Sequence, residues 1–185
     1  MSNEGRIEEK HVVRCILFRH GIAVNREEWT GKDGDRPLTD KGKRRVKLAA
    51  AGLRRVNVRP SHLFTSPLIR AVETARLLHG GFGGRIPLQL VDELLPESVP
   101  EKVISMLHNL PPDSCALCVG HEPQLGLTAS VLLSGGPSPA FPLKKSGACL
   151  IELLVPVKPG RGRLIWWLTP SQLRTIGKGK SDGED

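Results

Sequence analysis

Short apolar runs alternate with amphipathic stretches along this chain, and that alternation limits the possible folds more than any other feature. Four runs resemble buried strands, each followed by a stretch with helical spacing of apolar residues: 12–18, 62–65, 88–91 and 115–119. Two further runs, 147–155 and 163–169, are joined by the turn-forming KPGRG and predict an antiparallel hairpin at a sheet edge. The pattern predicts an α/β sandwich with a mostly parallel sheet.

Helix start signals follow two of these segments. Thr39 is placed to cap a helix that runs to about Arg55. Ser66 followed by Pro67 predicts a second helix, with serine as the N-cap and proline at the first helical position.

The length of 185 residues suits one domain of ordinary size. We expect a flexible N-terminus over 1–10, a single domain over 11–176 and a disordered tail over 177–185. No apolar run approaches the roughly 20 residues of a membrane span, and the polar N-terminus lacks the apolar core of a signal peptide. We therefore expect a cytoplasmic protein with no membrane partner.

Four cysteines occur, and two of them form the pair Cys115-Ala-Leu-Cys118. No second pair of ligands follows at a spacing suited to zinc, and residues three apart in a strand point to opposite faces. The cysteines are therefore interpreted as buried thiols in a reducing compartment, and no metal is expected.

The basic residues are concentrated in the first third of the chain. From Lys41 to Arg59 there are eight basic residues and no acidic one. This segment is either a solvated helix face or a surface for nucleic acid, an anionic membrane or an acidic protein. The aromatic content of 4%, with no tyrosine, argues against nucleic acid as the main partner.

Polar motifs stand where three predicted strands end. They are Arg19-His20-Gly21, Ser66-Pro67 with Arg70 one turn further on, and Gly120-His121. In open α/β sheets ligands bind beyond the carboxyl ends of the strands, so Arg19, His20, Arg70 and His121 are expected to meet there. Two guanidiniums, two imidazoles and a helix N-terminus suit a compact, multiply charged oxyanion such as phosphate.

His20 is the candidate nucleophile of this group. Imidazole attacks phosphorus when it is neutral, and the like charges of Arg19 and Arg70 should keep His20 neutral. Arg19, Arg70 and His121 would hold the phosphoryl oxygens, and Gly21 would let the backbone approach closely.

Five segments resemble the histidine phosphatase superfamily, which contains the cofactor-dependent phosphoglycerate mutases, and its short SixA-type phosphohistidine phosphatases in particular. They are LFRHG (17–21), RPLTDKGKRR (36–45), TSPLIRAVETA (65–75), VGHEPQLG (119–126) and LIWWLTPSQL (164–173). The resemblance covers roughly residues 12–175. It implies a three-layer, phosphoglycerate mutase-like α/β/α sandwich with an antiparallel edge strand.

The resemblance also implies roles for single residues. His20 would accept the phosphate, and Arg19, Arg70 and His121 would complete the pocket without metal or cofactor. Larger members of the family carry an acidic general acid in the loop after the third strand. Glu93 is the candidate here and Glu97 a weaker one, and the favoured alternative for both is a solvated acidic loop or a helix cap.

These observations favour a phosphatase that works through a phosphohistidine intermediate and acts on phosphohistidine in proteins. One alternative is a phosphomonoesterase or phosphoanhydride hydrolase for a small metabolite on the same fold. The other is a non-catalytic phosphoprotein-binding module that docks through 41–59. The sequence leaves the oligomeric state open.

Overall fold

The computed structural model describes residues 11–179. Its elements, in chain order, are β1 (Val12–Arg19), the 3-10 helix η1 (Asp33–Asp35), α1 (Asp40–Arg55), β2 (His62–Thr65), α2 (Ile69–Gly81), β3 (Leu88–Leu90), the 3-10 helix η2 (Asp92–Leu94), α3 (Pro100–His108), β4 (Cys115–Gly120), α4 (Gln124–Ser134), β5 (Ala148–Leu154), β6 (Arg163–Leu168) and α5 (Pro170–Lys178).

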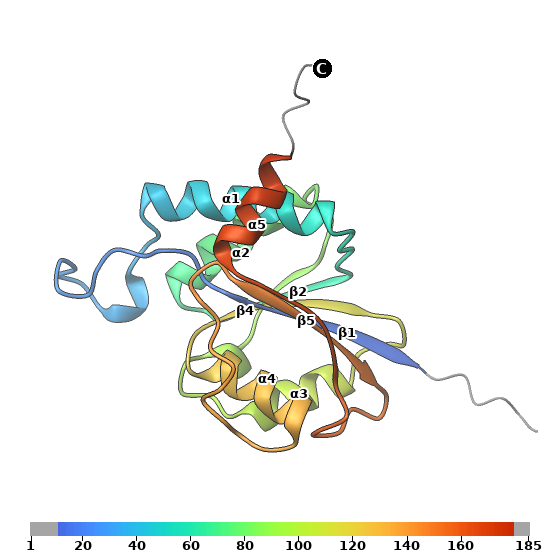
Figure 1. The fold of residues 1–185 in the computed structure, drawn as a ribbon. Helices are drawn as coiled ribbons and strands as arrows, with labels where there is room; N and C mark the ends of the chain where they lie inside the picture. Colours follow the sequence, from blue (N-terminus) through green and yellow to red (C-terminus); the bar gives the residue numbers. More distant parts are fainter. Residues whose placement is uncertain (1–10, 180–185) are drawn as a thin grey trace, which may run out of the picture.

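The strands form one mixed sheet in the order β3-β2-β4-β1-β5-β6. The first four run parallel to one another, whereas β5 is antiparallel to both β1 and β6. The predicted hairpin is therefore β5–β6, at one edge of the sheet (Figure 1). The prediction of a mostly parallel sheet with an antiparallel edge is confirmed.

Helices cover both faces of the sheet and make three layers. Helices α1, α2 and α5 lie on one face, and α3 and α4 lie on the other (Figure 1). The central strand β1 serves both cores, because Ile16 and Phe18 face the first layer while Cys15 and Leu17 face the second. All four side chains have no exposed surface, which is why this strand is an unbroken apolar run.

The four cysteines are free and buried. Cys115 packs in the core beneath α1 and α2, whereas Cys118 packs in the core above α3 and α4. The prediction that these two thiols occupy opposite faces of one strand is confirmed, and the pair cannot close a disulfide or hold one metal ion together.

The C-terminal helix extends beyond the predicted domain end at residue 176. Gly177 and Lys178 belong to α5, which corrects the expected start of the disordered tail. Gly177 lies against the Leu48 carbonyl of α1, where a side chain would not fit, so α5 can continue past this position while it packs closely on α1. The remaining tail, 180–185, and the N-terminal segment 1–10 lie outside the described residues. Within 11–179, none of the helices has the length and apolar character needed to cross a membrane.

The contact between α1 and α5 gives a stability prediction. A Cβ at Gly52 would clash with the backbone of Leu173 in α5. One of the two helices would have to shift to relieve the clash. We expect Gly52→Ala to lower the free energy of unfolding by about 1–3 kcal/mol through overpacking, despite the better helix propensity of alanine. Urea denaturation measures the change.

Gly80→Ala is the matched control, because a Cβ at this helical glycine meets nothing within 4 Å. It should raise stability by up to about 1 kcal/mol. A Gly52→Ala protein as stable as the wild type would contradict the tight contact.

Candidate functional site

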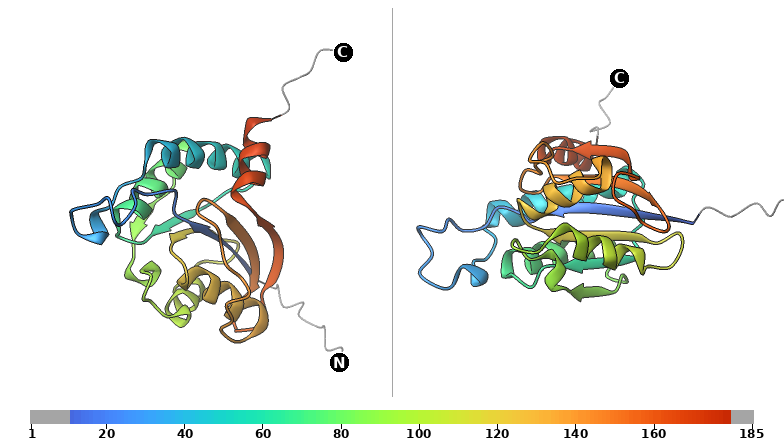
Figure 2. Two further views of the ribbon diagram at one scale, coloured as in Figure 1. Left: turned by 60° about the vertical axis from the view of Figure 1, so that its left-hand side comes forward. Right: turned by 90° about the horizontal axis from the view of Figure 1, so that it is seen from below.

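The three parallel strands β1, β2 and β4 end together at one edge of the sheet. Arg19 of β1 is paired in register with Gly120 of β4, and the His20 amide donates to the Gly120 carbonyl at 3.1 Å. The Ser66 amide, just after β2, donates to the Val119 carbonyl at 3.0 Å. The segment between β1 and α1 extends beyond this edge (Figure 2). The residues that follow these strands are thereby brought to one place.

The two histidines predicted for the site lie side by side. The ring centroids of His20 and His121 are 4.9 Å apart, with the ring planes tilted by 54°. Only 6% of His20 and 2% of His121 is exposed. A single tetrahedral anion can therefore contact both imidazoles.

Backbone contacts determine which nitrogen of His20 is free. Its Nδ1 lies 2.7 Å from the Gly21 carbonyl oxygen, which can only accept, so Nδ1 carries the proton. The lone pair is then on Nε2, the atom suited to attack. The Gly21 amide donates to Thr74 Oγ1 at 3.0 Å, which fixes this segment to α2.

His121 is oriented by a serine. Its Nε2 lies 2.9 Å from Ser66 Oγ. The same serine oxygen accepts a hydrogen bond from the Leu68 amide at 3.3 Å. The prediction of Ser66 as a helix N-cap is therefore wrong: α2 begins three residues later, after Leu68, and has no side-chain cap. The Ser66 hydroxyl instead forms a hydrogen bond with His121 and orients its ring.

Both imidazoles are held in the neutral state. Burial lowers the pKa of His20 to about 3, and the charges of Arg70, Arg19 and Lys145 add to this, while the hydrogen bond to Gly21 opposes it. Burial likewise lowers the pKa of His121 to about 2. The expected direction for His20 is confirmed, but its main cause is desolvation rather than the neighbouring arginines.

Arg70 is buried and held by an acidic loop residue. Its Nη1 donates to the Asp33 carbonyl at 2.9 Å, and its Nη2 lies 3.2 Å from the Asp33 carboxylate. Arg36 donates from Nε to the same carboxylate at 2.8 Å. The loop between β1 and α1 therefore positions two guanidiniums through one acid.

Arg19 is positioned from the opposite side, by the loop before β5. Its Nη1 donates to the Leu143 carbonyl at 2.8 Å, and the Leu143 amide donates to Glu122 Oε1 at 2.9 Å. Two buried nitrogens have no partner in the described part of the chain, Arg19 Nε and His121 Nδ1. Both are nitrogens that an anion could satisfy.

Sequence reasoning did not identify several residues of this site. Arg36 stands in the RPLT segment, but nothing in the pattern linked it to Asp33 or placed its charge near His121. Lys145, whose charge acts on His20, lies in a loop with no motif. Burial lowers the pKa of Lys145, and the nearby arginines lower it further. The site is thus more cationic than predicted.

The segment of the candidate acid Glu93 lies beside the start of α4, where Gln124 Nε2 donates to the Glu93 carbonyl at 3.3 Å. Glu93 lines a cavity beside α3, together with Lys102 and Ser105, and Glu97 is exposed. The groups whose charges act on His20 and His121 are basic side chains. No hydrogen bond or ion pair among the described residues joins the Glu93 carboxylate to either histidine, so its role as general acid stays a prediction.

The donor set suits an anion rather than a cation. Within the described residues, no group of three or more His, Cys, Asp or Glu side chains is arranged to hold a metal ion. Two neutral imidazoles on which two nearby guanidiniums act, at the carboxyl ends of the parallel strands, define the class: an α/β protein whose polar side chains at this edge suit a tetrahedral oxyanion.

Comparison with known proteins gives the family. The model of the histidine phosphatase superfamily (branch 1) matches residues 15–96. An uncharacterized protein of Picosynechococcus is 38% identical over 137 residues, which is 73% of this chain and 82% of the relative. The protein histidine phosphatase SixA, solved with tungstate, is 25% identical with a TM-score of 0.75, over 86% of this chain and 99% of SixA.

A phosphoglycerate mutase from Bacillus anthracis shares the fold at 16% identity, with a TM-score of 0.65 over 94% of this chain and all of the mutase. This protein belongs to the histidine phosphatase superfamily, in its SixA-like branch. The predicted phosphoglycerate mutase-like fold is confirmed, and the fold is that of a phosphatase for a phosphorylated substrate.

The buried histidines predict a loss of stability in acid. Their pKa values in the folded protein lie below the ordinary value near 6.5, so the unfolded chain takes up protons that the native state does not. Stability is lost as pH falls below about 6.5. Between pH 7.5 and pH 5 each histidine should lower the free energy of unfolding by about 2 kcal/mol. Urea denaturation at both pH values, in phosphate-free buffer, measures the loss.

The variant His20→Gln/His121→Gln serves as the reference for this effect. It should lack most of that acid-dependent loss, because the two titrating rings are gone. An identical pH dependence in both proteins would mean that neither histidine is neutral in the fold.

Proposed function

We propose that this protein removes phosphate from phosphohistidine side chains of other proteins, through a phosphohistidine formed on His20. The observation that carries the proposal is the buried, neutral His20–His121 pair, on which the charges of Arg19 and Arg70 both act. The tungstate held by the similar SixA protein supports it, because tungstate is a tetrahedral oxyanion like phosphate.

In the first step Nε2 of His20 attacks phosphorus. The Nε2–P bond forms, the bond from phosphorus to the leaving group breaks, and the leaving group departs with the electron pair. The Gly21 carbonyl holds the Nδ1 proton and stabilises the positive charge that develops on the ring. Water then attacks phosphorus, phosphate leaves, and the lone pair of Nε2 is restored.

Arg19, Arg70 and His121 stabilise the transferring phosphoryl group. Arg19 Nε and His121 Nδ1 are free to donate to its oxygens. The Ser66 hydroxyl, which accepts from the Leu68 amide, can donate to His121 Nε2 and so place the ring proton on Nδ1. Fixed donors aimed at the phosphoryl oxygens stabilise the transition state without metal.

The surroundings of the site favour phosphohistidine over a phosphate ester. An alkoxide leaving group needs a strong acid, whereas a protonated imidazole leaves as a neutral ring. The charges that act on the two histidines are positive, and the nearby Asp33 carboxylate is already engaged by Arg70 and Arg36. The site therefore suits a substrate that brings a good leaving group.

The surface over the site suits a protein substrate. The chain aligns with 99% of the SixA protein over 86% of its own length, which leaves few residues to build a lid over the site. A small metabolite is usually enclosed in a deep pocket, whereas a side chain on another protein needs a shallow one.

The four cysteines of this protein are free thiols, which suit the reducing cytoplasm. We propose the cytoplasm as its compartment.

Removal of the nucleophile gives the first functional prediction. His20→Ala should lower the turnover of an aryl phosphate by about a thousandfold or more, because no other group can accept the phosphoryl. Phosphoenzyme that is stable in alkali and lost in acid should be trapped from the wild type by a quench in alkaline detergent, and should be absent from the variant. His108→Ala, at an exposed histidine on α3, is the control and should keep full activity.

A substrate panel tests the choice of substrate. We expect kcat/KM for a phosphohistidine protein to exceed that for free phosphohistidine and for small phosphate esters by about a hundredfold or more. The assay measures phosphate release from each substrate in parallel. A preference for a small ester would assign the protein to metabolite hydrolysis, and no release from any substrate would leave a binding module.

A further inference from the structure

A second concave site lies at the far end of α1 from the histidines. Its cavity has a volume of about 680 Å³, which is the size of a site for a small organic ligand. The lining residues come from the ends of α1, α2 and α5 and from the segment after α1: Ala51, Arg54, Arg55, Arg59, Gly80, Gly81, Phe82, Gly83 and Gly177. We call it the arginine pocket.

The catalytic edge and the arginine pocket are separate. Helix α1 begins after the loop that carries Asp33 and ends at Arg55, and its 16 residues span about 24 Å. The two sites are therefore too far apart for one small molecule to fill both.

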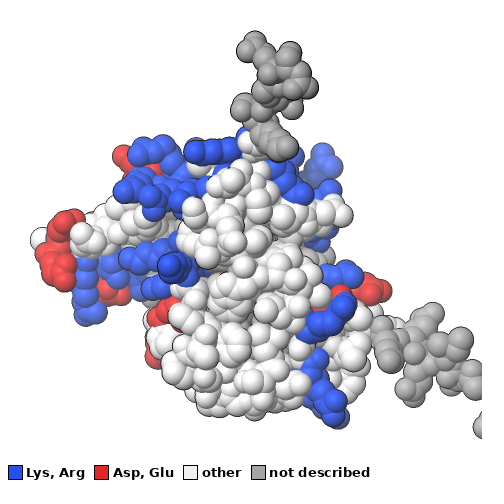
Figure 3. Space-filling view, viewed as in Figure 1, with Lys and Arg blue, Asp and Glu red and all other residues white. Residues whose placement is uncertain are grey.

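The arginine pocket is strongly cationic. Arg54, Arg55 and Arg59 are exposed, and no acidic residue lines the cavity. None of the three takes part in an ion pair among the described residues. Lysine and arginine side chains also cover much of the surface over α1, whereas the lower part of the same view is mostly uncharged (Figure 3). Such a pocket attracts an anion.

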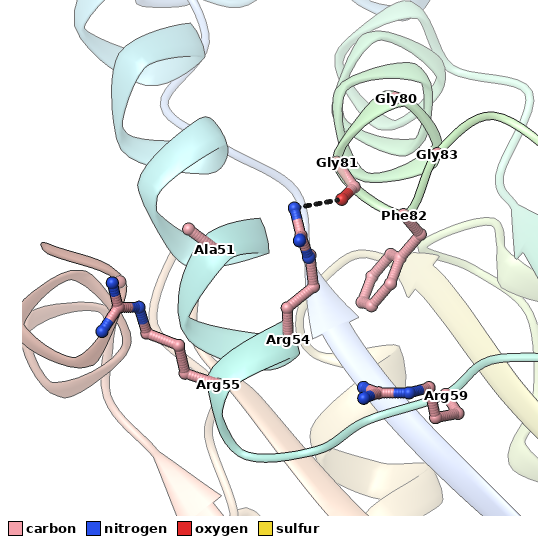
Figure 4. A pocket seen from close by; sticks show the side chains of 9 residues that line it. Ala51, Arg54, Arg55, Arg59, Gly80, Gly81, Phe82 and Gly83 are labelled. Carbon is pink, nitrogen blue, oxygen red and sulfur yellow. Dashed lines mark hydrogen bonds between the residues drawn. The ribbon is translucent and has the colours of Figure 1, made fainter. Parts of the chain in front are cut away.

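Figure 4 shows how the three guanidiniums are arranged. Arg54 extends toward α2, where its Nη1 donates to the Gly81 carbonyl at 3.3 Å. Arg59 lies below the Phe82 ring in this view, and its Nη1 donates to the Val58 carbonyl at 3.0 Å. Each of these two guanidiniums uses one N–H on the backbone and keeps several for a ligand, as the bidentate binding of phosphate requires. Arg55 extends away from the other two, toward α5 and Gly179.

The wall opposite the arginines is built of small residues and one aromatic ring. A Cβ at Gly80 or Gly83 would meet nothing within 4 Å, so no side chain blocks the pocket there. Phe82 is half-buried and packs against the core beneath α1 and α2, which fixes its ring. A fixed aromatic ring beside arginines offers a stacking surface for a nucleobase.

We propose that the arginine pocket binds a nucleoside polyphosphate, with the arginines holding the phosphate chain and Phe82 contacting the base. Two separate guanidiniums near the ring, those of Arg54 and Arg59, suit a chain of phosphates better than a single phosphate. A bounded cavity with one aromatic ring suits one nucleotide better than a nucleic-acid strand, which needs a track of stacking surfaces.

Calorimetric titration of ATP tests the proposal in the His20→Ala protein, which cannot turn the nucleotide over. The variant Arg54→Ala/Arg59→Ala should bind ATP about tenfold more weakly or worse, because two guanidiniums on the phosphates are lost. Phe82→Leu should lower the affinity for ATP by about tenfold, because the base contact is lost. Its affinity for tripolyphosphate should stay within about twofold of the parent's, because that ligand has no base. Thermal unfolding checks that each variant is folded, and Arg59→Gln replaces the double variant if it is not.

Lys41→Ala/Arg44→Ala is the matched control, since it removes two exposed charges from the other end of α1. It should bind ATP within about twofold of the parent. In an otherwise wild-type chain, Arg54→Ala/Arg59→Ala should retain aryl phosphate turnover. If the parent protein does not bind ATP, or if the control loses as much ATP affinity as Arg54→Ala/Arg59→Ala, the arginine pocket is not the binding site. If Phe82→Leu binds ATP as tightly as the parent, the pocket does not recognise the nucleoside.

Discussion

Backbone hydrogen bonds between β1 and β4 set the positions of both histidines, and the rest of the site depends on that register. Arg19 pairs with Gly120, so the next residue of each strand is a histidine at the same level of the sheet edge. A slip of one residue would turn one ring into a helical layer. Once the rings are together, burial keeps both neutral, and the cations around them can act on an anion without protonating the nucleophile.

Much of the fold could be predicted because burial on both faces leaves a simple pattern. The run 12–18 is apolar throughout since β1 contacts helices on each side, and the β5–β6 hairpin was marked by its KPGRG turn. The ends of the helices are harder to predict from the sequence. Ser66-Pro67 has the local signature of a helix start, but the serine hydroxyl is engaged by His121, a residue 55 positions away. α5 continues through Gly177, a poor helix former, where the absence of a side chain lets it pack closely on α1, a contact that helix propensity cannot reveal.

The main residues of the site could be located because strand ends converge by topology, which places Arg19, His20 and His121 at one edge. The supporting groups could not, because they come from loops whose paths no periodicity fixes. Asp33, Arg36 and Lys145 act on the site through contacts between segments far apart in sequence. The size of the desolvation effect on His20 also requires the packed structure, since neighbouring charges alone suggested a smaller shift.

The Asp33–Arg70 ion pair has a consequence for the catalytic cycle. A phosphate that enters the pocket shares Arg70 with a carboxylate that already occupies two of its nitrogens, and the two anions repel each other. Ground-state affinity for free phosphate is lowered as a result. The proposed phosphatase would on that account release its phosphate product more readily than a site whose arginine has no carboxylate partner.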